Sequence, residues 1–319
     1  MLLPALAAYG ADELRCIAVW EDGVLGALFP LRLVRRYRGL PVSALCSWRH
    51  RNMMIGTPLV REKSAVNCLT ALIAQAPAPI LELDLVAPDG PFYAALTDVA
   101  PPAEFPWLVR DAYPRAVLSR ERDPRERYNS SLKSNLRRWE AKLRAAGELA
   151  PVSLKPGDDL DRWLADFMQL EASGWKGTSG TALTCRDDDR RFVAAVLPEA
   201  FRRGQLRITG LDLAGAALAR HIMITAGDGA FTFKIAYDEA YANFAPGIVA
   251  EVDNVRQFLE NPGPRWIDSN TARENKSYGR VWKDRRTIQT IAIGLRGAGR
   301  LAVATLPLIR LAKRWLKRT

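Results

Sequence analysis

The fold is decided by the stretch that reads LRITGLDL (206–213), ALARHIMIT (217–225) and FTFKIAY (231–237). Each segment is rich in apolar and β-branched residues, as sheet strands are. Ala214-Gly215-Ala216 is a hairpin-type link between the first two segments, and Gly227-Asp228-Gly229 is a second turn. The pattern therefore predicts three strands that follow one another directly in a sheet.

A helical pattern follows the third strand and begins at Pro246-Gly247, and RWID (265–268) then resumes as a short strand. Proline fits the first turn of a helix, and the adjacent glycine permits the close approach of a ligand. A helix that starts just after a strand directs its free N–H groups beyond the strand end, where they can bind an anion. We expect a pyrophosphate site for a phosphate-bearing cofactor here. The predicted cofactor-binding residues are Pro246, Gly247, Ile248 and Val249.

Length and composition exclude several classes of protein. The chain has 319 residues, enough for two domains, and 48% of them are apolar, enough for sizeable cores. It has no long apolar run that predicts a transmembrane helix, and its first residues do not resemble a signal peptide. Four cysteines without a close pair and two histidines exclude a Cys-x-x-Cys site and a multi-histidine metal centre. We therefore expect a cytoplasmic, metal-free protein.

The net charge of +11 depends largely on the last residues of the chain. Residues 296–319 contain seven basic residues and no acidic one, and without them the net charge is +4, so the charge does not indicate DNA binding. We expect a helix that starts at Pro307 and has one apolar and one basic face. The apolar face consists of Leu308, Leu311, Ala312, Trp315 and Leu316. This pattern favours either an anionic membrane surface or docking onto the protein's own core.

Two further features concern organisation. A hairpin at 15–20 and 24–34 has the same form as the hairpin at 206–225, which suits two copies of one α/β unit. A helix is predicted from a cap at Ser130 or Ser131 to Gly147. Its polar face is either solvated or a contact for an anionic ligand or tRNA phosphates. The basic residues of this face are Lys133, Arg137, Arg138, Lys142 and Arg144.

Four motifs carry a resemblance to a known family: LEASGWKGTSGTAL (170–183), FKIAYDEAYANFAPG (233–247), IDSN (267–270) and VWKDRR (281–286). With these motifs the chain resembles the CelD/BcsL-type acetyltransferases of the GNAT superfamily, which are related to the Fem-type aminoacyl transferases. The likeness covers roughly residues 125–290. Only Pro246-Gly247 stands where the family has a glycine-rich acyl-CoA loop, so the use of acyl-CoA rests on the resemblance.

The resemblance implies an α/β (α+β) fold of two tandem GNAT-like domains, each a mixed, mostly antiparallel sheet flanked by helices. The expected N-terminal domain is residues 1–124, with its first helices short or absent. The expected acyltransferase domain is residues 125–295, followed by a basic amphipathic tail at 296–319.

N-acyl transfer from a thioester needs a base for the amine, stabilisation of an oxyanion and a proton for the thiolate, but no covalent nucleophile. Glu171, at the end of a helix, is the predicted base, with surface polarity or binding of the next loop's N–H groups as the alternative. Tyr237 or Tyr241 is predicted to protonate the thiolate. Asp268 is the expected partner of Lys234, which sits mid-strand and is costly to bury alone. The predicted catalytic residues are Glu171, Tyr237 and Asp268.

The remaining candidates lie beside these residues in sequence. Trp175 and Lys176 offer an aromatic face and a cation to the substrate or cofactor phosphates, with core packing as the alternative for Trp175. His221, inside a strand, is interpreted as a structural histidine. The predicted substrate-binding residues are Trp175, Lys176, Lys234, Asp238 and Tyr241.

We therefore predict an N-acyltransferase that moves an acyl group, acetyl or longer, from acyl-CoA to an amine. The expected acceptor is a lipid, a sugar or an envelope or polysaccharide precursor, at the inner face of a membrane. One alternative is a Fem-type transferase that takes its acyl group from aminoacyl-tRNA. The other is a non-catalytic accessory protein of polysaccharide biosynthesis.

Overall fold

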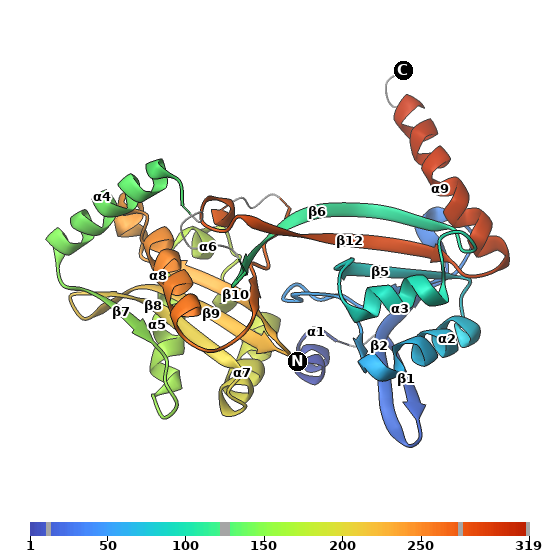
Figure 1. The fold of residues 1–319 in the computed structure, drawn as a ribbon, viewed down its shortest axis with the longest axis horizontal. Helices are drawn as coiled ribbons and strands as arrows, with labels where there is room; N and C mark the ends of the chain where they lie inside the picture. The colour runs from blue at the N-terminus through green and yellow to red at the C-terminus, as the bar shows by residue number, and fades with distance from the viewer. Residues whose placement is uncertain (11–13, 122–127, 274–276, 317–319) are drawn as a thin grey trace. The chain divides into compact units, whose positions relative to one another are not determined.

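The computed structural model describes residues 1–10, 14–121, 128–273 and 277–316. The chain divides into two compact units (Figure 1). We call residues 11–114 with 286–319 the amino-terminal unit, and residues 1–10 with 115–285 the central unit. The chain passes between the units within two long strands, β6 (Trp107–Ser119) and β12 (Asp284–Gly294).

The central unit contains a mixed sheet in the order β6-β11-β10-β9-β8-β7. Its strands after β6 are β7 (Leu149–Ser153), β8 (Leu206–Leu213), β9 (Ala216–Ala226), β10 (Gly229–Tyr237) and β11 (Trp266–Asp268). Only β10 and β11 pair in parallel among these neighbours, and α8 (Pro246–Glu260) connects them. The predicted strands and the helix between them are confirmed.

Helices cover both faces of this sheet. His221 and Arg220 are neighbours in β9, and their side chains reach Glu251 of α8 and Asp166 of α5 (Leu160–Ser173) respectively. Because successive strand residues point to opposite faces, α8 and α5 lie on different sides of the sheet. On the α8 side, α4 (Ser130–Ala146) contributes to the same apolar cluster as α8. On the α5 side, α7 (Asp187–Arg202) packs against α1 (Leu2–Tyr9).

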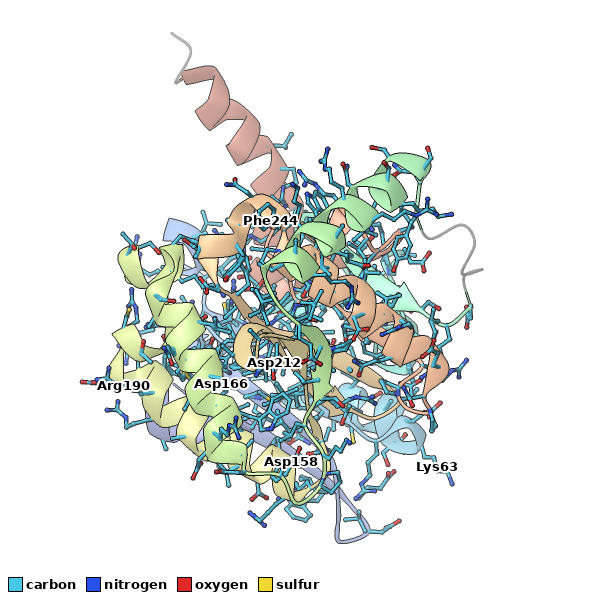
Figure 2. All side chains as sticks on the ribbon, turned by 90° about the vertical axis from the view of Figure 1, so that its left-hand side faces the viewer. Lys63, Asp158, Asp166, Arg190, Asp212 and Phe244 are labelled. Atoms are coloured by element: carbon cyan, nitrogen blue, oxygen red, sulfur yellow. The ribbon has the colours of Figure 1, made fainter. Side chains whose placement is uncertain are left out.

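A buried arginine fixes α5 to the sheet. Arg220 lies 2.8 Å from the carboxylate of Asp166 in α5 and 2.7 Å from that of Asp212 in β8. Its guanidinium also lies over the ring of Trp163, 4.9 Å from the centroid. Figure 2 labels both residues, and Asp166 and Asp212 lie near each other in it. A charge this deeply buried requires such partners.

The helix α4 differs from expectation at its start. The cap is Asn129, whose side chain accepts a hydrogen bond of 2.8 Å from Leu132 N. The predicted cap at Ser130 or Ser131 is therefore wrong by one or two residues. Asn129 is the cap because its backbone is extended, as a cap requires, whereas Ser130 and Ser131 already lie within the helix.

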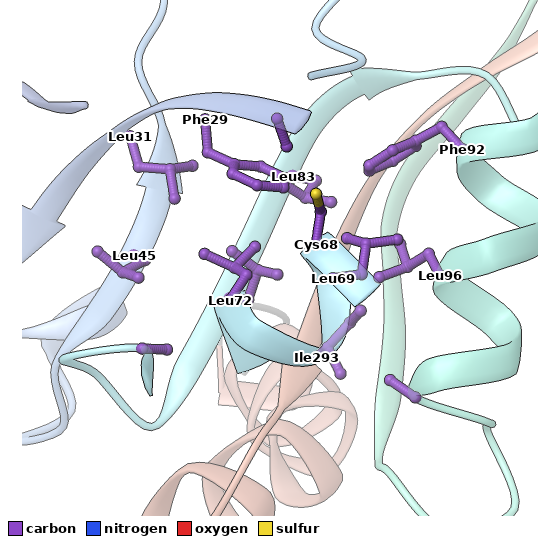
Figure 3. Packing of buried hydrophobic residues seen from close by; sticks show 14 of the residues in the cluster. Phe29, Leu31, Leu45, Cys68, Leu69, Leu72, Leu83, Phe92, Leu96 and Ile293 are labelled. Carbon is purple, nitrogen blue, oxygen red and sulfur yellow. The ribbon is translucent and has the colours of Figure 1, made fainter. Parts of the chain in front are cut away.

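The amino-terminal unit repeats the same order of elements. Its strands are β1 (Leu14–Glu21), β2 (Val24–Val34), β3 (Ala44–Ser47) and β5 (Ile80–Val86), followed in the sheet by β12, while β4 (Leu59–Val60) pairs with β2. Only β3 and β5 pair in parallel, and α2 (Ala65–Gln75) connects them. The series β1-β2-β3-α2-β5 therefore matches β8-β9-β10-α8-β11 in strand direction. Figure 3 shows its core, which α2 and α3 (Pro91–Val99) cover, with Phe29, Leu69 and Leu96 fully buried.

The last helix of the described residues is α9 (Gly297–Leu316), which belongs to the amino-terminal unit. Pro307 lies inside this helix, so the prediction that a helix starts there is wrong. The earlier start is explained by packing, because Ala302, Val303 and Leu306 are buried in an apolar cluster with Tyr37. The side chains of residues 309–319, including most of the predicted apolar face, lie outside the described part of the structure. Among the described residues, every helix is too short or too polar to span a membrane.

Candidate active site

The site is built around the point where β10 and β11 separate. The two strands pair at Gly229 with Trp266, Ala230 with Ile267 and Phe231 with Asp268, and β10 then continues to Tyr237. A bulge between Thr232 and Lys234 interrupts its register with β9. On the side that faced β11, the main chain of β10 beyond Phe231 has no neighbouring strand among the described residues. Such an edge offers backbone donors and acceptors to a ligand.

A short loop after α5 is attached to this part of β10. Lys176 Nζ donates hydrogen bonds to the carbonyl oxygen of Ile235, at 2.6 Å, and to Glu171 Oε1, at 3.1 Å. The backbone N–H of Leu183 donates to Glu171 Oε2 at 2.8 Å. Both oxygens of the buried Glu171 carboxylate thus hold the loop of residues 174–183. This is the binding of loop N–H groups given above as the alternative for Glu171, while its role as a base stays a prediction.

The same loop meets the segment after β10. Glu239 Oε1 accepts a hydrogen bond of 2.8 Å from the backbone N–H of Trp175. A Cβ atom on Gly174 would lie 2.8 Å from that oxygen, so this contact depends on glycine. Trp175 itself is 58% exposed, which excludes core packing as its role. The motifs 170–183 and 233–247 therefore pack against each other, although they are distant in sequence.

The carboxylates whose charges act on Lys234 are Glu171 of α5 and Asp189 of α7, not Asp268 of β11. Burial lowers the pKa of Lys234, and Glu171 and Asp189 counteract this effect, with Lys176 adding to it. Asp189 also accepts a 2.6 Å hydrogen bond from the hydroxyl of Tyr9. The expected pairing of Lys234 with Asp268 is thus not formed. The cause is register, because Asp268 lies opposite Phe231, before the bulge that precedes Lys234.

Asp268 is instead completely buried beside an arginine. Its Oδ1 lies 3.4 Å from Arg115 Nη1 and accepts a 2.8 Å hydrogen bond from the N–H of Asn270. Asn270 has a φ of 50°, so Asp268 stabilises a tight turn where the chain leaves β11. The contacts give Asp268 a structural role at the separation point, and its catalytic role stays a prediction.

The amino terminus of α8 offers fewer free N–H groups than expected. The N–H groups of Ile248 and Val249 both donate to the carbonyl of Ala245, at 2.9 and 3.1 Å, and Pro246 has no N–H. Within this turn, the N–H of Gly247 is therefore the one that does not donate to the carbonyl of Ala245. A Cβ atom on Gly247 would lie 3.0 Å from the ring of Tyr237, so the glycine lets helix and strand end approach closely.

The remaining candidate residues, Tyr237, Asp238 and Tyr241, lie at the end of β10 and in the segment between β10 and α8. Asp238 Oδ1 accepts a 2.9 Å hydrogen bond from Ala240 N and caps the short helix Glu239–Phe244. Tyr237 and Tyr241 are half-buried against the apolar cluster of α4 and α8. Tyr237 thus lies next to Gly247, and the functional roles of Tyr237, Asp238 and Tyr241 stay predictions.

Sequence reasoning missed a buried polar network on the α8 side of the sheet. His221 Nδ1 lies 2.9 Å from Glu251 Oε2, and Glu251 Oε1 accepts hydrogen bonds from Trp282 Nε1 at 2.8 Å and Asn254 Nδ2 at 3.2 Å. Burial, followed by the nearby Glu251, raises the pKa of Tyr278 well above its usual value. His221 is 1% exposed and matches the structural role proposed for it. A glutamate at a position that α8 buries was the available signal, and it was overlooked.

The described residues contain no group of His, Cys, Asp or Glu side chains arranged to hold a metal ion. Residues 130–278 match the family described as the acetyltransferase (GNAT) domain. None of the curated protein sequences matches the chain significantly.

Solved structures of similar fold cover both units. The structure of FemX has 12% identity and a TM-score of 0.50 over 88% of this chain and 87% of its own. L-PGS from Bacillus licheniformis has 13% identity and a TM-score of 0.56 over 96% and 89%. The C-terminal domain of a putative lysylphosphatidylglycerol synthetase from Agrobacterium fabrum has 11% identity and a TM-score of 0.54 over 95% and 89%.

At these identities the structures establish the fold alone. Residues 130–278 thus match the model of the acetyltransferase (GNAT) domain, and both units are built on mixed, mostly antiparallel sheets flanked by helices. The resemblance to the CelD/BcsL type in particular stays a prediction.

Proposed function

We propose that the central unit is an N-acyltransferase that moves an acyl group from acyl-CoA to an amine. The observation that carries the proposal is the separation of β10 from β11 after Phe231, beside Lys176 and Lys234. A thioester laid along this open edge would meet the unpaired main chain of β10. A backbone N–H there can stabilise the oxyanion that forms when the thioester carbonyl is attacked.

The proposed reaction proceeds by direct attack of the amine on the thioester, without a covalent enzyme intermediate. The amine nitrogen attacks the thioester carbon, the carbon–sulfur bond breaks, and the proton released by the amine equals the proton taken up by the thiolate. Because burial lowers its pKa, Lys234 is suited to accept the first proton and return the second. In this proposal Glu171 positions the loop through Lys176, since both of its oxygens already accept hydrogen bonds. Tyr237 and Asp238, at the end of β10, line the acceptor side.

The family match supports acyl-CoA as the donor, because residues 130–278 match a family described by acetyl transfer. The acceptor we propose is an amine on a lipid, a sugar or an envelope precursor. The lipid is supported by one neighbour of similar fold, whose name mentions lysylphosphatidylglycerol.

The test is a thermal shift of the full chain with CoA, acetyl-CoA and palmitoyl-CoA. A ligand that binds only the folded state raises the melting temperature with its concentration. A shift with one of the CoA species supports the proposal, and the preferred chain length indicates the acyl group. The absence of any shift overturns it.

The second candidate is transfer from aminoacyl-tRNA. The specific observation in its favour is the exposed basic face of α4, whose apolar face is buried. The lone free N–H of the α8 turn, at Gly247, also weakens the case for a pyrophosphate site. A thermal shift with tRNA but not with CoA, lost in Lys133→Glu/Arg137→Glu, would favour this candidate. Silence with both ligands would favour a non-catalytic accessory protein.

A further inference from the structure

The strand β1 forms one edge of the sheet in the amino-terminal unit. It pairs with β2 along its length, and among the described residues no strand pairs with its other side (Figure 1). Edge strands are commonly short, bulged or charged in the middle, which prevents pairing with another chain. β1 has eight residues, its charged residues Arg15 and Glu21 lie near its ends, and the bulge in its pairing places the extra residue, Gly26, in β2. The outer edge of β1 is therefore open to a further strand.

One face of β1 is apolar and exposed. Ile17 and Val19 face the core of the unit, where they pack against the cluster that α2 covers. Because successive strand residues point to opposite faces, the other face carries Cys16, Ala18 and Trp20. All three are exposed, and Trp20 is 63% exposed. β1 thus combines an open backbone edge with an exposed aromatic side chain.

The charges of β1 are complementary to those of a second, antiparallel copy of the same strand. If two copies pair about a twofold axis at Ala18, Arg15 of each copy lies opposite Glu21 of the other. Opposite charges in such cross-strand positions attract. Glu21 accepts hydrogen bonds from Asn67, at 2.6 Å, and from Ser64, but neither charge forms an ion pair within the described part of the chain. Both charges are therefore available to a second copy.

The apolar side chains of β1 favour the same axis. With the axis at Ala18, Trp20 of one copy lies opposite Cys16 of the other, so the large indole meets the smallest side chains of the exposed face. Moving the axis by one residue in either direction would place one of the two charges opposite a core-facing apolar residue. The register with its axis at Ala18 is thus the one in which size and charge both match.

We propose that the chain forms a homodimer in which β1 of one copy pairs with β1 of a second copy about a twofold axis at Ala18. The two amino-terminal sheets would join into one continuous sheet through main-chain hydrogen bonds across the axis. A second copy is the partner that fits, because an identical strand supplies the charge opposite Arg15 and the charge opposite Glu21 at once. The proposal goes beyond acyl transfer and does not rest on it.

The test is analytical ultracentrifugation of the full chain over a series of concentrations. We expect a reversible dimer with a dissociation constant on the order of 10 μM, because one strand pair buries less surface than a standard interface. Ala18→Lys places two ammonium groups opposite each other, and Arg15→Glu places carboxylates opposite each other. Each change should weaken dimerisation about tenfold. The double variant Arg15→Glu/Glu21→Arg exchanges the charges and should restore the dimer.

The register is tested by disulfide formation. The background variant Cys16→Ser removes the other thiol of the strand. Adding Ala18→Cys then places two thiols opposite each other at the axis, with their Cα atoms about 5 Å apart, which a disulfide can bridge. On mild oxidation this double variant should give a covalent dimer, and Cys16→Ser alone should not.

Matched controls come from exposed residues of the same unit. Lys63→Glu makes the same charge change as Arg15→Glu, and Ala94→Lys makes the same substitution as Ala18→Lys. Both controls should dimerise like the unchanged chain. A monomer at every concentration, equal losses in the controls, a full dimer in Ala18→Lys, or no restoration by the charge exchange would each overturn the proposal. The CoA thermal shift is scored separately, so failure here leaves the proposed function unaffected.

Discussion

Lys176 donates a 2.6 Å hydrogen bond to the carbonyl oxygen of Ile235, 59 residues later in the chain. This bond joins the loop after α5 to the part of β10 that has lost its parallel neighbour β11. Because a lysine ammonium has three donors, the same side chain also binds Glu171. One residue thus links the helix, the loop and the strand that frame the candidate site.

The pair Glu171–Lys176 should be energetically coupled. Glu171→Gln leaves Lys176 without its ion pair, and Lys176→Met leaves a buried carboxylate, so each change should destabilise the protein by about 2 kcal/mol. The double variant should cost less than the sum of the two by about 1 kcal/mol. Urea unfolding of the four proteins measures this coupling, and strictly additive losses would contradict it.

Gly247 should be essential for ligand binding rather than for folding. A Cβ atom there would lie 3.0 Å from the ring of Tyr237, and a glutamate would place a negative charge at the turn proposed to bind the pyrophosphate. Gly247→Glu should therefore abolish CoA binding while the far-ultraviolet circular dichroism stays unchanged. Gly247→Ala should weaken binding about tenfold. Tyr237→Ala in the Gly247→Ala background makes room for the new methyl group and should restore part of the binding. Full CoA binding by Gly247→Glu would contradict the assignment of Gly247 to the cofactor site.

Lys234 should make stability depend on pH in the alkaline range. Burial lowers its pKa in the folded protein below the ordinary value of 10.5, so between these two values the unfolded chain binds more protons. The free energy of unfolding should therefore rise with pH through that window. Lys234→Met should remove this rise and stabilise the protein near neutral pH by about 1 kcal/mol. An unchanged pH profile in Lys234→Met would argue against a depressed pKa.

Lys234 should also control the rate of acyl transfer if it accepts and returns the protons of the reaction. Acyl transfer should then fall about a hundredfold or more in Lys234→Met, while binding of CoA is retained. The pH profile of kcat distinguishes this role from substrate binding, since the acidic limb, where protonation of the base lowers the rate, should disappear in the variant. A variant that loses only affinity for the amine would assign Lys234 to substrate binding instead.

The network around His221 should contribute to stability. Glu251→Gln removes the charge that faces His221 and should destabilise the central unit by about 3 kcal/mol, because both groups are almost completely buried. Glu260→Gln, at the exposed end of the same helix, is the matched control and should change stability by less than about 0.5 kcal/mol. Guanidinium unfolding measures the stability of both variants. Similar losses in Glu251→Gln and Glu260→Gln would mean that the buried network around His221 does not contribute to stability.

Much of the central sheet could be predicted because its signals are local. Alternating apolar residues define β8 and β10, and Pro246-Gly247 marks the start of α8 within one turn. Those patterns depend on the geometry of a few consecutive residues. The start of α9 could not be predicted in this way, because it is set by packing of Ala302 and Val303 against a distant cluster.

Several residues selected from the sequence as site candidates lie near one another, but the sequence did not predict their contacts correctly. Glu171, Lys176 and Lys234 were selected from the sequence, and all three do lie together. The partner of Lys234 was chosen wrongly, because one bulge in β10 decides which strand residues face each other. Asp189 and Glu251 went unnoticed because each meets its partner only after a helix has packed on the sheet.

The sequence by itself determined the order of strands and helices and the positions where the chain turns. Those features follow from side-chain periodicity and backbone preferences, which act over short distances. The tertiary structure decided which charges meet, that Asp268 faces Arg115, and that α9 leaves Leu301 and Leu308 uncovered. These outcomes depend on strand register and on the packing of segments far apart in the chain, and no local pattern contains that information.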